Sequence, residues 1–190
     1  LDNNENLKGL ELMDKLYQAI LKKIVLKITY QSFSAKSPNI FNFHGYILKE
    51  FNNRWFLVGR RDGLTKISTL AIDRITHVDI DLSVDYDDGN FKYDTYYSNT
   101  YGVTVLSEDQ LIDIEMRVDR YNAPYVLTKP IHSSQCLLKT YEDGAVIIGL
   151  TVHHNLEIER LLSGFAGSIE LLKPMSLRNR MRDKFRMAYL

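Results

Sequence analysis

The sequence predicts an α+β protein in which a small five-stranded β-barrel is followed by a βαββαβ domain. Three observations support this fold class. Five short segments with the alternation of β-strands follow one another through residues 24–82 and are joined by turn residues. Acidic residues and tyrosines then interrupt this pattern. A second series of strand and helix patterns begins near residue 111 and continues to the end of the chain.

The first half of the chain contains one helix and five strands. Apolar side chains recur at helical spacing over about residues 9–23, so we assign residues 1–23 to an N-terminal helix and linker. A closed barrel is favoured over an open sheet because closure removes the exposed edges of short strands joined by tight turns. The expected strands cover residues 24–31, about 40–50, the stretch around Trp55, and residues near 65–72 and 74–80.

Residues 83–107 are expected to form an acidic and aromatic linker between the two domains. Aspartates cluster between residues 79 and 94, with Gly89 and Asn90 among them. They lack the spaced ligands and the final glutamate of an EF-hand, so a solvated linker is favoured over a calcium loop.

The second domain is predicted to span residues 108–190. Its elements follow the order βαββαβ with one additional helix, which is the split βαβ or ferredoxin-like arrangement. Cys136 lies in an apolar strand, which favours a buried and unreactive thiol. The expected elements are a strand at 112–118, a helix near 120–128, strands near 132–141 and 145–153, a helix near 155–163, a strand at 168–172 and a last helix after Pro174.

Composition limits the classes of function. Lysine and arginine together number 24, as do aspartate and glutamate, so the net charge is zero and any nucleic-acid site must be local. The single cysteine excludes a disulfide framework and fits a reducing cytoplasm. No apolar run approaches the roughly 20 residues that span a membrane, and no signal peptide is visible, so we expect a cytoplasmic protein without a membrane partner. Because the chain starts at Leu1, we interpret it as a fragment that lacks its N-terminal part.

Residues 54–75 interleave aromatic and arginine side chains on a short antiparallel pair, a composition suited to stacking bases and neutralising phosphate. Arg60 and Arg74 are the preferred phosphate ligands, because the guanidinium fork can bind phosphate bidentately. Arg61 remains an alternative to Arg60, and salt bridges with nearby aspartates are the structural alternative. Trp55 is the candidate stacking residue, and the alternative is that it packs inside the barrel or against the first helix.

Three further side chains complete the predicted ligand-binding site. Tyr30 and Ser32 share a strand face and could offer hydroxyl groups to the same ligand. His44 could donate to a phosphate or sugar oxygen and would add charge when protonated. The alternatives are hydroxyls that cap neighbouring backbone and a structural histidine. We predict that all these side chains converge on one face of the barrel.

Residues 10–82 resemble the WYL domain, the ligand-sensing module of many bacterial transcription regulators. Phe56 stands where the family usually has tyrosine, Gly45 where it often has proline, and Arg60 where many relatives have an aromatic residue. The later residues resemble the C-terminal extension called WCX, at 143–144, 161–164 and 172–178. The segments that carry the first resemblance are 30–33, 43–50, 54–57 and 70–75.

The resemblance implies an Sm-like or SH3-like barrel that binds nucleic-acid or nucleotide-type effectors, including single-stranded DNA. Such proteins usually carry an N-terminal winged helix-turn-helix domain that binds operator DNA. None is visible in this sequence, so operator binding would belong to the missing part. The family also implies a homodimer.

Two other functions remain as alternatives. A general single-stranded nucleic-acid-binding barrel normally has a basic surface, which the zero net charge does not provide. A nucleotide-processing enzyme would need a recognisable catalytic motif, and we find no G-x-S-x-G, H-E-x-x-H or P-loop pattern. We therefore expect no catalytic residues and no cofactor.

Two other groups of residues were considered as sites. The histidines His132, His153 and His154 lack the spacing of metal ligands, so no metal site is expected. The last helix is basic and offers a possible secondary nucleic-acid surface through Arg178, Arg182 and Arg186. The alternative is a solvated helix face whose cations favour the C-terminal half of the helix.

Overall fold

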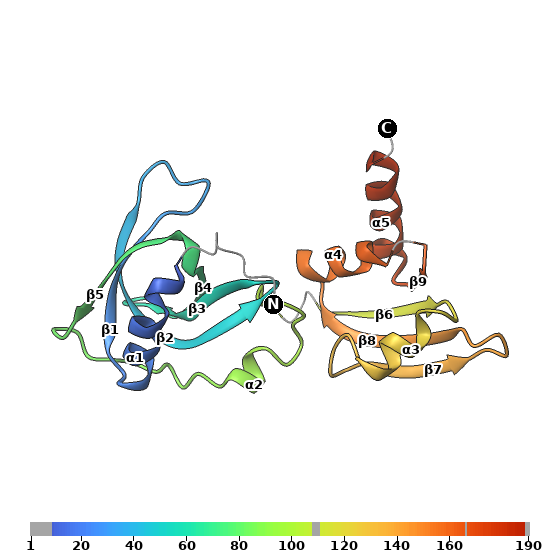
Figure 1. Ribbon diagram of the computed structural model, residues 1–190, viewed down its shortest axis with the longest axis horizontal. Helices are drawn as coiled ribbons and strands as arrows, with labels where there is room; N and C mark the ends of the chain where they lie inside the picture. The colour runs from blue at the N-terminus through green and yellow to red at the C-terminus, as the bar shows by residue number, and fades with distance from the viewer. Residues whose placement is uncertain (1–8, 108–110, 166, 189–190) are drawn as a thin grey trace. The chain divides into compact units, whose positions relative to one another are not determined.

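The computed structural model describes residues 9–107, 111–165 and 167–188. The chain divides into two compact units, with the boundary between Lys92 and Tyr93 (Figure 1). This boundary lies within the segment expected to be a linker.

The first unit contains the predicted helix and all five predicted strands. The strands form one antiparallel sheet in the order β4-β3-β2-β1-β5. Helix α1 contacts β2 and buries its apolar face in the core of this unit. The elements are η1 (Leu10–Leu12), α1 (Met13–Leu21), β1 (Val25–Tyr30), β2 (Asn39–Phe51), β3 (Arg54–Arg61), β4 (Ile67–Ala71), η2 (Ile72–Arg74) and β5 (Ile75–Asp81).

The prediction of a closed barrel is wrong. Strands β4 and β5 stand at the two edges of the sheet, and no ladder joins them in the part of the chain that the structure describes. The short 3-10 helix η2 links them instead. Two features protect the exposed edges from pairing with another chain: β4 has only five residues, and β5 exposes the polar side chain of His77 and the charged side chain of Asp79.

The β2–β3 hairpin is the central feature of this sheet. Asn52 and Asn53 form its two-residue connection, and both have positive φ angles, of 51° and 59°. Asparagine tolerates this conformation, which the tightest hairpin turns require. Farther along the hairpin Gly45 pairs with Gly59, and a Cβ atom on Gly59 would lie only 2.1 Å from the carbonyl oxygen of His44. Glycine at position 59 therefore allows the two strands to approach closely beside His44.

Part of the expected linker packs on the first sheet. The hydroxyl of Tyr86 donates to the carbonyl oxygen of Gly45 at 2.7 Å. The ring of Phe91 stacks on that of Tyr46, with 5.2 Å between the ring centres. The residues that follow β5 are thus part of the first unit and not merely a solvated connection.

The second unit has the predicted order of elements from β6 to α5. Its antiparallel sheet has the order β7-β8-β6-β9, and alternate residues of β6 and β8 form a core with residues of α3, α4 and α5. The described helices include none that is long and apolar enough to cross a membrane. The elements are α2 (Tyr93–Tyr96), β6 (Leu111–Val118), α3 (Ala123–Thr128), β7 (Cys136–Thr140), β8 (Val146–His153), α4 (Leu156–Gly164), β9 (Ile169–Lys173) and α5 (Met175–Ala188).

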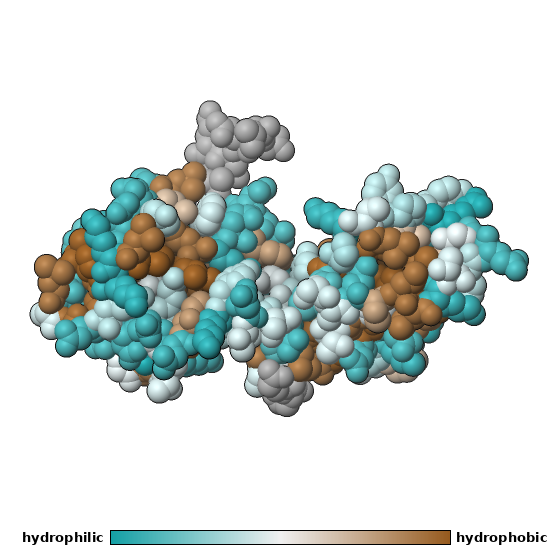
Figure 2. Space-filling model, turned by 90° about the horizontal axis from the view of Figure 1, so that it is seen from below, coloured by the Kyte–Doolittle hydropathy of each residue, from teal (hydrophilic) through white to brown (hydrophobic). Residues whose placement is uncertain are grey.

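The expectation of a buried Cys136 is wrong, because this residue is exposed. Strand β7 lies at the edge of its sheet and all five of its residues are exposed, including Leu137 and Leu138. Hydrophobic residues are visible on the surface of both units, interspersed with hydrophilic ones (Figure 2).

Candidate functional site

The structure places the predicted ligand-binding residues in two regions of the first sheet. Tyr30, Ser32 and Arg74 lie where β1 ends and η2 leads into β5, since Tyr30 pairs with Ile75. His44 and Arg60 pair with each other on β2 and β3. The two regions are separated along β1. Phe43, the neighbour of His44, pairs with Leu26, which lies four residues before Tyr30, or about 13 Å along an extended strand.

Arg74 and Phe33 form an exposed cation–π pair. The guanidinium carbon of Arg74 lies 4.1 Å from the centre of the Phe33 ring, and Phe33 is 80% exposed. The backbone N–H of Gln31 donates to the carbonyl oxygen of Arg74 at 3.1 Å, which holds the end of β1 against η2. The Nε atom of Arg74 is buried and has no partner among the described residues. This pair presents a flat ring and a positive charge side by side.

The residues around this pair are partly buried. Tyr30 and Trp55 both pack against the core of the first unit, which is the packing alternative considered for Trp55. The hydroxyl oxygen of Ser32 lies 3.3 Å from that of Ser34, in the turn that contains Phe33. The accessible aromatic surface at this place is therefore that of Phe33.

His44 lies inside the sheet at 1% exposure and has a partner at each ring nitrogen. The backbone N–H of Asp87 donates to Nδ1 at 3.1 Å, and Nε2 lies 3.2 Å from a carboxylate oxygen of Asp62. Because Nδ1 accepts a hydrogen bond, the neutral ring carries its proton on Nε2 and donates it to Asp62. These contacts correspond to the structural alternative for His44.

Arg60 is already paired with a carboxylate. Its guanidinium forms an ion pair with Asp87 and is largely shielded from solvent. A backbone N–H bond from Gly89 and the contact with Arg60 hold the pKa of Asp87 below its ordinary value. Burial raises the pKa of Tyr86 to about 12, and burial also raises the pKa of Tyr46, so both phenols stay neutral.

The basic surface predicted on α5 is interrupted by acidic partners. Arg178 pairs with Glu170 at 2.9 Å and Arg182 with Asp183 at 3.4 Å, whereas Arg186 is exposed in the last turn. Such exposed pairs contribute little to stability, but they reduce the positive potential of this helix.

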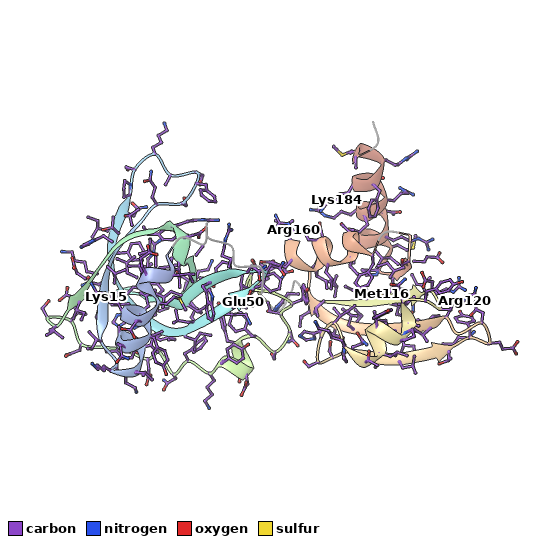
Figure 3. The ribbon with its side chains drawn as sticks, in the orientation of Figure 1. Lys15, Glu50, Met116, Arg120, Arg160 and Lys184 are labelled. Atoms are coloured by element: carbon purple, nitrogen blue, oxygen red, sulfur yellow. The ribbon has the colours of Figure 1, made fainter. Side chains whose placement is uncertain are left out.

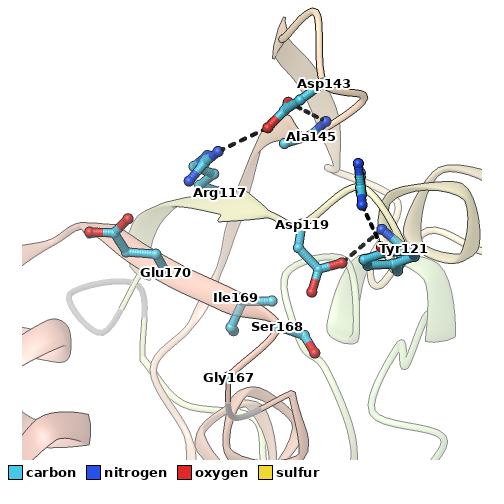
Figure 4. Close-up of a pocket in the computed structure, with 10 residues that line it drawn as sticks. Arg117, Asp119, Tyr121, Asp143, Ala145, Gly167, Ser168, Ile169 and Glu170 are labelled. Carbon is cyan, nitrogen blue, oxygen red and sulfur yellow. Dashed lines mark hydrogen bonds and ion pairs between the residues drawn. The ribbon is translucent and has the colours of Figure 1, made fainter.

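A hollow of about 330 Å³ lies at the end of β6 in the second unit, where Arg117 pairs with Asp143 at 3.5 Å (Figure 4). Asp119 accepts the backbone N–H groups of Tyr121 and Asn122, and the Asn122 N–H holds the pKa of Asp119 below its ordinary value. These groups are already paired within the hollow. No group of three or more His, Cys, Asp or Glu residues is arranged to hold a metal ion in the described ranges.

Comparison with known families identifies both units. Residues 11–80 match the family model of the WYL domain, and residues 110–189 match that of the WCX domain. The chain carries a WYL domain followed by a WCX domain. The first match lies within the first compact unit and contains the Phe33–Arg74 pair, and the second match lies within the second unit.

Two solved structures resemble the chain at low sequence identity. One is proteasome accessory factor B/C of Arthrobacter aurescens, with 14% identity, a TM-score of 0.39 and coverage of 92% of this chain. The other is a CRISPR Cas-related protein, with 11% identity, a TM-score of 0.54 and coverage of 94% of this chain. The WYL–WCX chain spans 26% and 50% of these two chains, respectively. No curated protein matches the sequence.

Sequence reasoning missed residues that complete both regions of the WYL domain. Phe33 was recognised only as part of a resembling segment, although a phenylalanine between two serines in a turn is a signal for an exposed ring. Asp87, which contacts both His44 and Arg60, lies 43 residues after His44 in the sequence. No local pattern could have placed it there.

Proposed function

We propose that this chain is the ligand-sensing region of a transcription regulator, and that its WYL domain binds a nucleic-acid or nucleotide-type effector at the surface of Phe33 and Arg74. The observation that carries this proposal is the guanidinium 4.1 Å from an exposed aromatic ring. An unpaired base can stack on the free face of Phe33, while Arg74 neutralises the adjacent phosphate. This combination favours single-stranded nucleic acid over a duplex, whose bases are already stacked.

The other predicted residues have supporting roles in this proposal. Tyr30 and Ser32 flank the Phe33 turn and offer hydroxyl groups to the same ligand, and Trp55 packs against the core of the WYL domain. His44 and Arg60 maintain the other end of the sheet through Asp62 and Asp87. Effector binding would change the equilibrium between two states of a homodimer, and thereby the operator affinity of an attached DNA-binding domain. We propose no catalytic role and no cofactor, and we place the protein in the cytoplasm.

The proposal also includes the fold of the WCX domain. We propose that it is a split βαβ, or ferredoxin-like, fold, which is supported by the order of its elements and by the strand order β7-β8-β6-β9.

Fluorescence anisotropy with labelled single-stranded oligonucleotides tests the proposed effector site. We expect Phe33→Ala and Arg74→Ala each to weaken binding by roughly tenfold, since base stacking on an aromatic residue contributes about 1–3 kcal/mol. Arg61→Ala is the matched control, because Arg61 also lies over an aromatic ring, 3.9 Å from the centre of Phe41. Circular dichroism monitors folding of each variant.

Wild-type affinity in both the Phe33 and Arg74 variants would refute this site. Equal losses in these variants and in Arg61→Ala, together with steep salt dependence and no preference for length or sequence, would instead indicate a general strand-binding surface.

A further inference from the structure

The WCX domain contains a buried carboxylate surrounded by basic side chains. Glu159 on α4 is only 2% exposed. One of its oxygens accepts hydrogen bonds from Nε2 of His154 and Nε of Arg180, both at 2.7 Å, and the other accepts from Lys184. Arg180 and Lys184 project from α5, four residues apart, so they share one face of that helix.

The basic groups exceed what this one carboxylate can neutralise. Burial alone would raise the pKa of Glu159, but hydrogen bonds from Lys184, His154 and Arg180 outweigh burial and hold the pKa below its ordinary value. Glu159 is therefore ionised at neutral pH and contributes one negative charge, whereas Arg180 and Lys184 contribute two positive charges.

Glu159 and Arg180 line an open hollow of about 650 Å³, and Lys184 is linked to it through its ion pair with Glu159. Arg180 and Lys184 remain 55% and 42% exposed although they contact a buried group. Arg160, one residue after Glu159, is exposed at the same hollow and has no ion pair within the described part of the chain. Figure 3 shows Arg160 and Lys184 on adjacent helices of this unit. The hollow is also lined by Thr104, Leu106, His154, Asn155, Leu156 and Glu157.

The side chains that line the hollow include two carboxylates and two guanidinium groups, and Lys184 adds a third cation through its contact with Glu159. Glu157 is the second acid, and one of its oxygens accepts the hydroxyl of Thr104 at 2.6 Å. Two carboxylates are thus matched by three cations, of which Arg160 and Arg180 line the hollow and Lys184 contacts Glu159. Arg180 engages Glu159 through Nε, the innermost nitrogen of its fork, so its outer nitrogens can meet a second anion.

We propose that this hollow is a binding site for a small phosphorylated molecule, with Arg160 and Arg180 as its phosphate ligands. Glu159 positions Arg180 before the ligand arrives, which reduces the ordering entropy that binding otherwise requires. The volume lies within the range of about 300–1,000 Å³ typical of small-molecule sites. The site belongs to the WCX domain and is independent of the effector surface proposed on the WYL domain.

Isothermal titration calorimetry of the 190-residue chain with inorganic pyrophosphate tests this site. We expect single-site binding with a Kd below about 1 mM, which Arg160→Ala weakens at least roughly fivefold by removing one charge-assisted contact. Arg160 is exposed, so its truncation should leave the fold intact. Arg178→Ala is the matched control, because it also removes one arginine charge from the WCX domain. Arg178 lies on α5, is paired with Glu170 and does not line the hollow.

Three results would overturn the proposal. The first is the absence of pyrophosphate binding by the unchanged chain. The second is an equal loss in Arg160→Ala and Arg178→Ala, which would indicate diffuse electrostatic attraction. The third is loss in Arg74→Ala with full binding in Arg160→Ala, which would place the phosphate on the WYL domain. Phe33→Ala should leave pyrophosphate binding unchanged, because Phe33 lies in the WYL domain. The pyrophosphate experiment therefore tests the WCX site separately from the effector site proposed on the WYL domain.

Discussion

Replacing Glu159 by glutamine should destabilise the WCX domain at neutral pH and have little effect in acid. The substitution keeps the shape of the side chain but removes the charge that accepts hydrogen bonds from His154, Arg180 and Lys184. A hydrogen bond to a charged group contributes about 1.5–3 kcal/mol. All three donors are partly solvated, so we expect a total loss of about 2 kcal/mol rather than the full sum.

The dependence on pH follows from the direction of the pKa shift. The folded-state pKa of Glu159 lies below its ordinary value, so the folded protein binds this proton less readily than the unfolded chain does. The stabilisation is complete above the unfolded pKa of about 4.3 and is lost as the pH falls through the folded-state pKa. The difference between wild type and Glu159→Gln should therefore be present at neutral pH and shrink below about pH 4.

Urea unfolding followed by circular dichroism at several pH values measures this difference. Trp55 is the only tryptophan and lies in the WYL domain, so its fluorescence reports separately on that domain. Glu170→Gln is the matched control, because it removes an exposed partner of α5 and should change the free energy of unfolding by less than about 1 kcal/mol. An unchanged free energy at pH 7, or an equal loss at pH 7 and pH 3, would refute the reasoning.

Two further predictions concern the fold. Gly59→Ala should destabilise the WYL domain by about 3 kcal/mol, because the new Cβ would clash with the carbonyl oxygen of His44. Gly164→Ala is the control and should be tolerated, because a Cβ at that position would meet open space. The denaturant concentration at the midpoint of unfolding, measured for both variants, tests this prediction. Cys136 should react with a thiol reagent in the folded protein at a rate close to that in urea, and strong protection would contradict the exposed position of β7.

The order of helices and strands could be predicted because it depends on local periodicity. Alternation identified β1 and β2, and helical spacing identified α1, within one or two residues of their observed ends in most cases. Closure of the first sheet could not be predicted in the same way. A closed barrel would require hydrogen bonds between the edge strands β4 and β5. The alternation of apolar and polar residues in the sequence is the same whether or not these two strands pair, so it does not distinguish a barrel from an open sheet.

Burial and contact partners were the less predictable part of the site. Cys136 is followed by two leucines, which reads as a core strand, but the pattern does not reveal that β7 lies at an edge. The same limit applies to Glu159, whose partners Arg180 and Lys184 were recognised only as members of a basic helix. Their convergence on one carboxylate arises from the packing of α5 near α4, which involves residues more than 20 positions apart.

Competition for the arginines is the reason that we place the proposed effector site at the Phe33 surface and not at Arg60. An anionic ligand at Arg60 must displace Asp87, which is ionised at neutral pH and held by a charge-assisted contact of about 1.5–3 kcal/mol. Arg74 instead lies over an aromatic ring, an interaction of about 0.5–1 kcal/mol at an exposed site, and it has no ion pair among the described residues. A phosphate can therefore approach Arg74 while the ring remains in place to stack a base, whereas at Arg60 it would first have to break an existing ion pair.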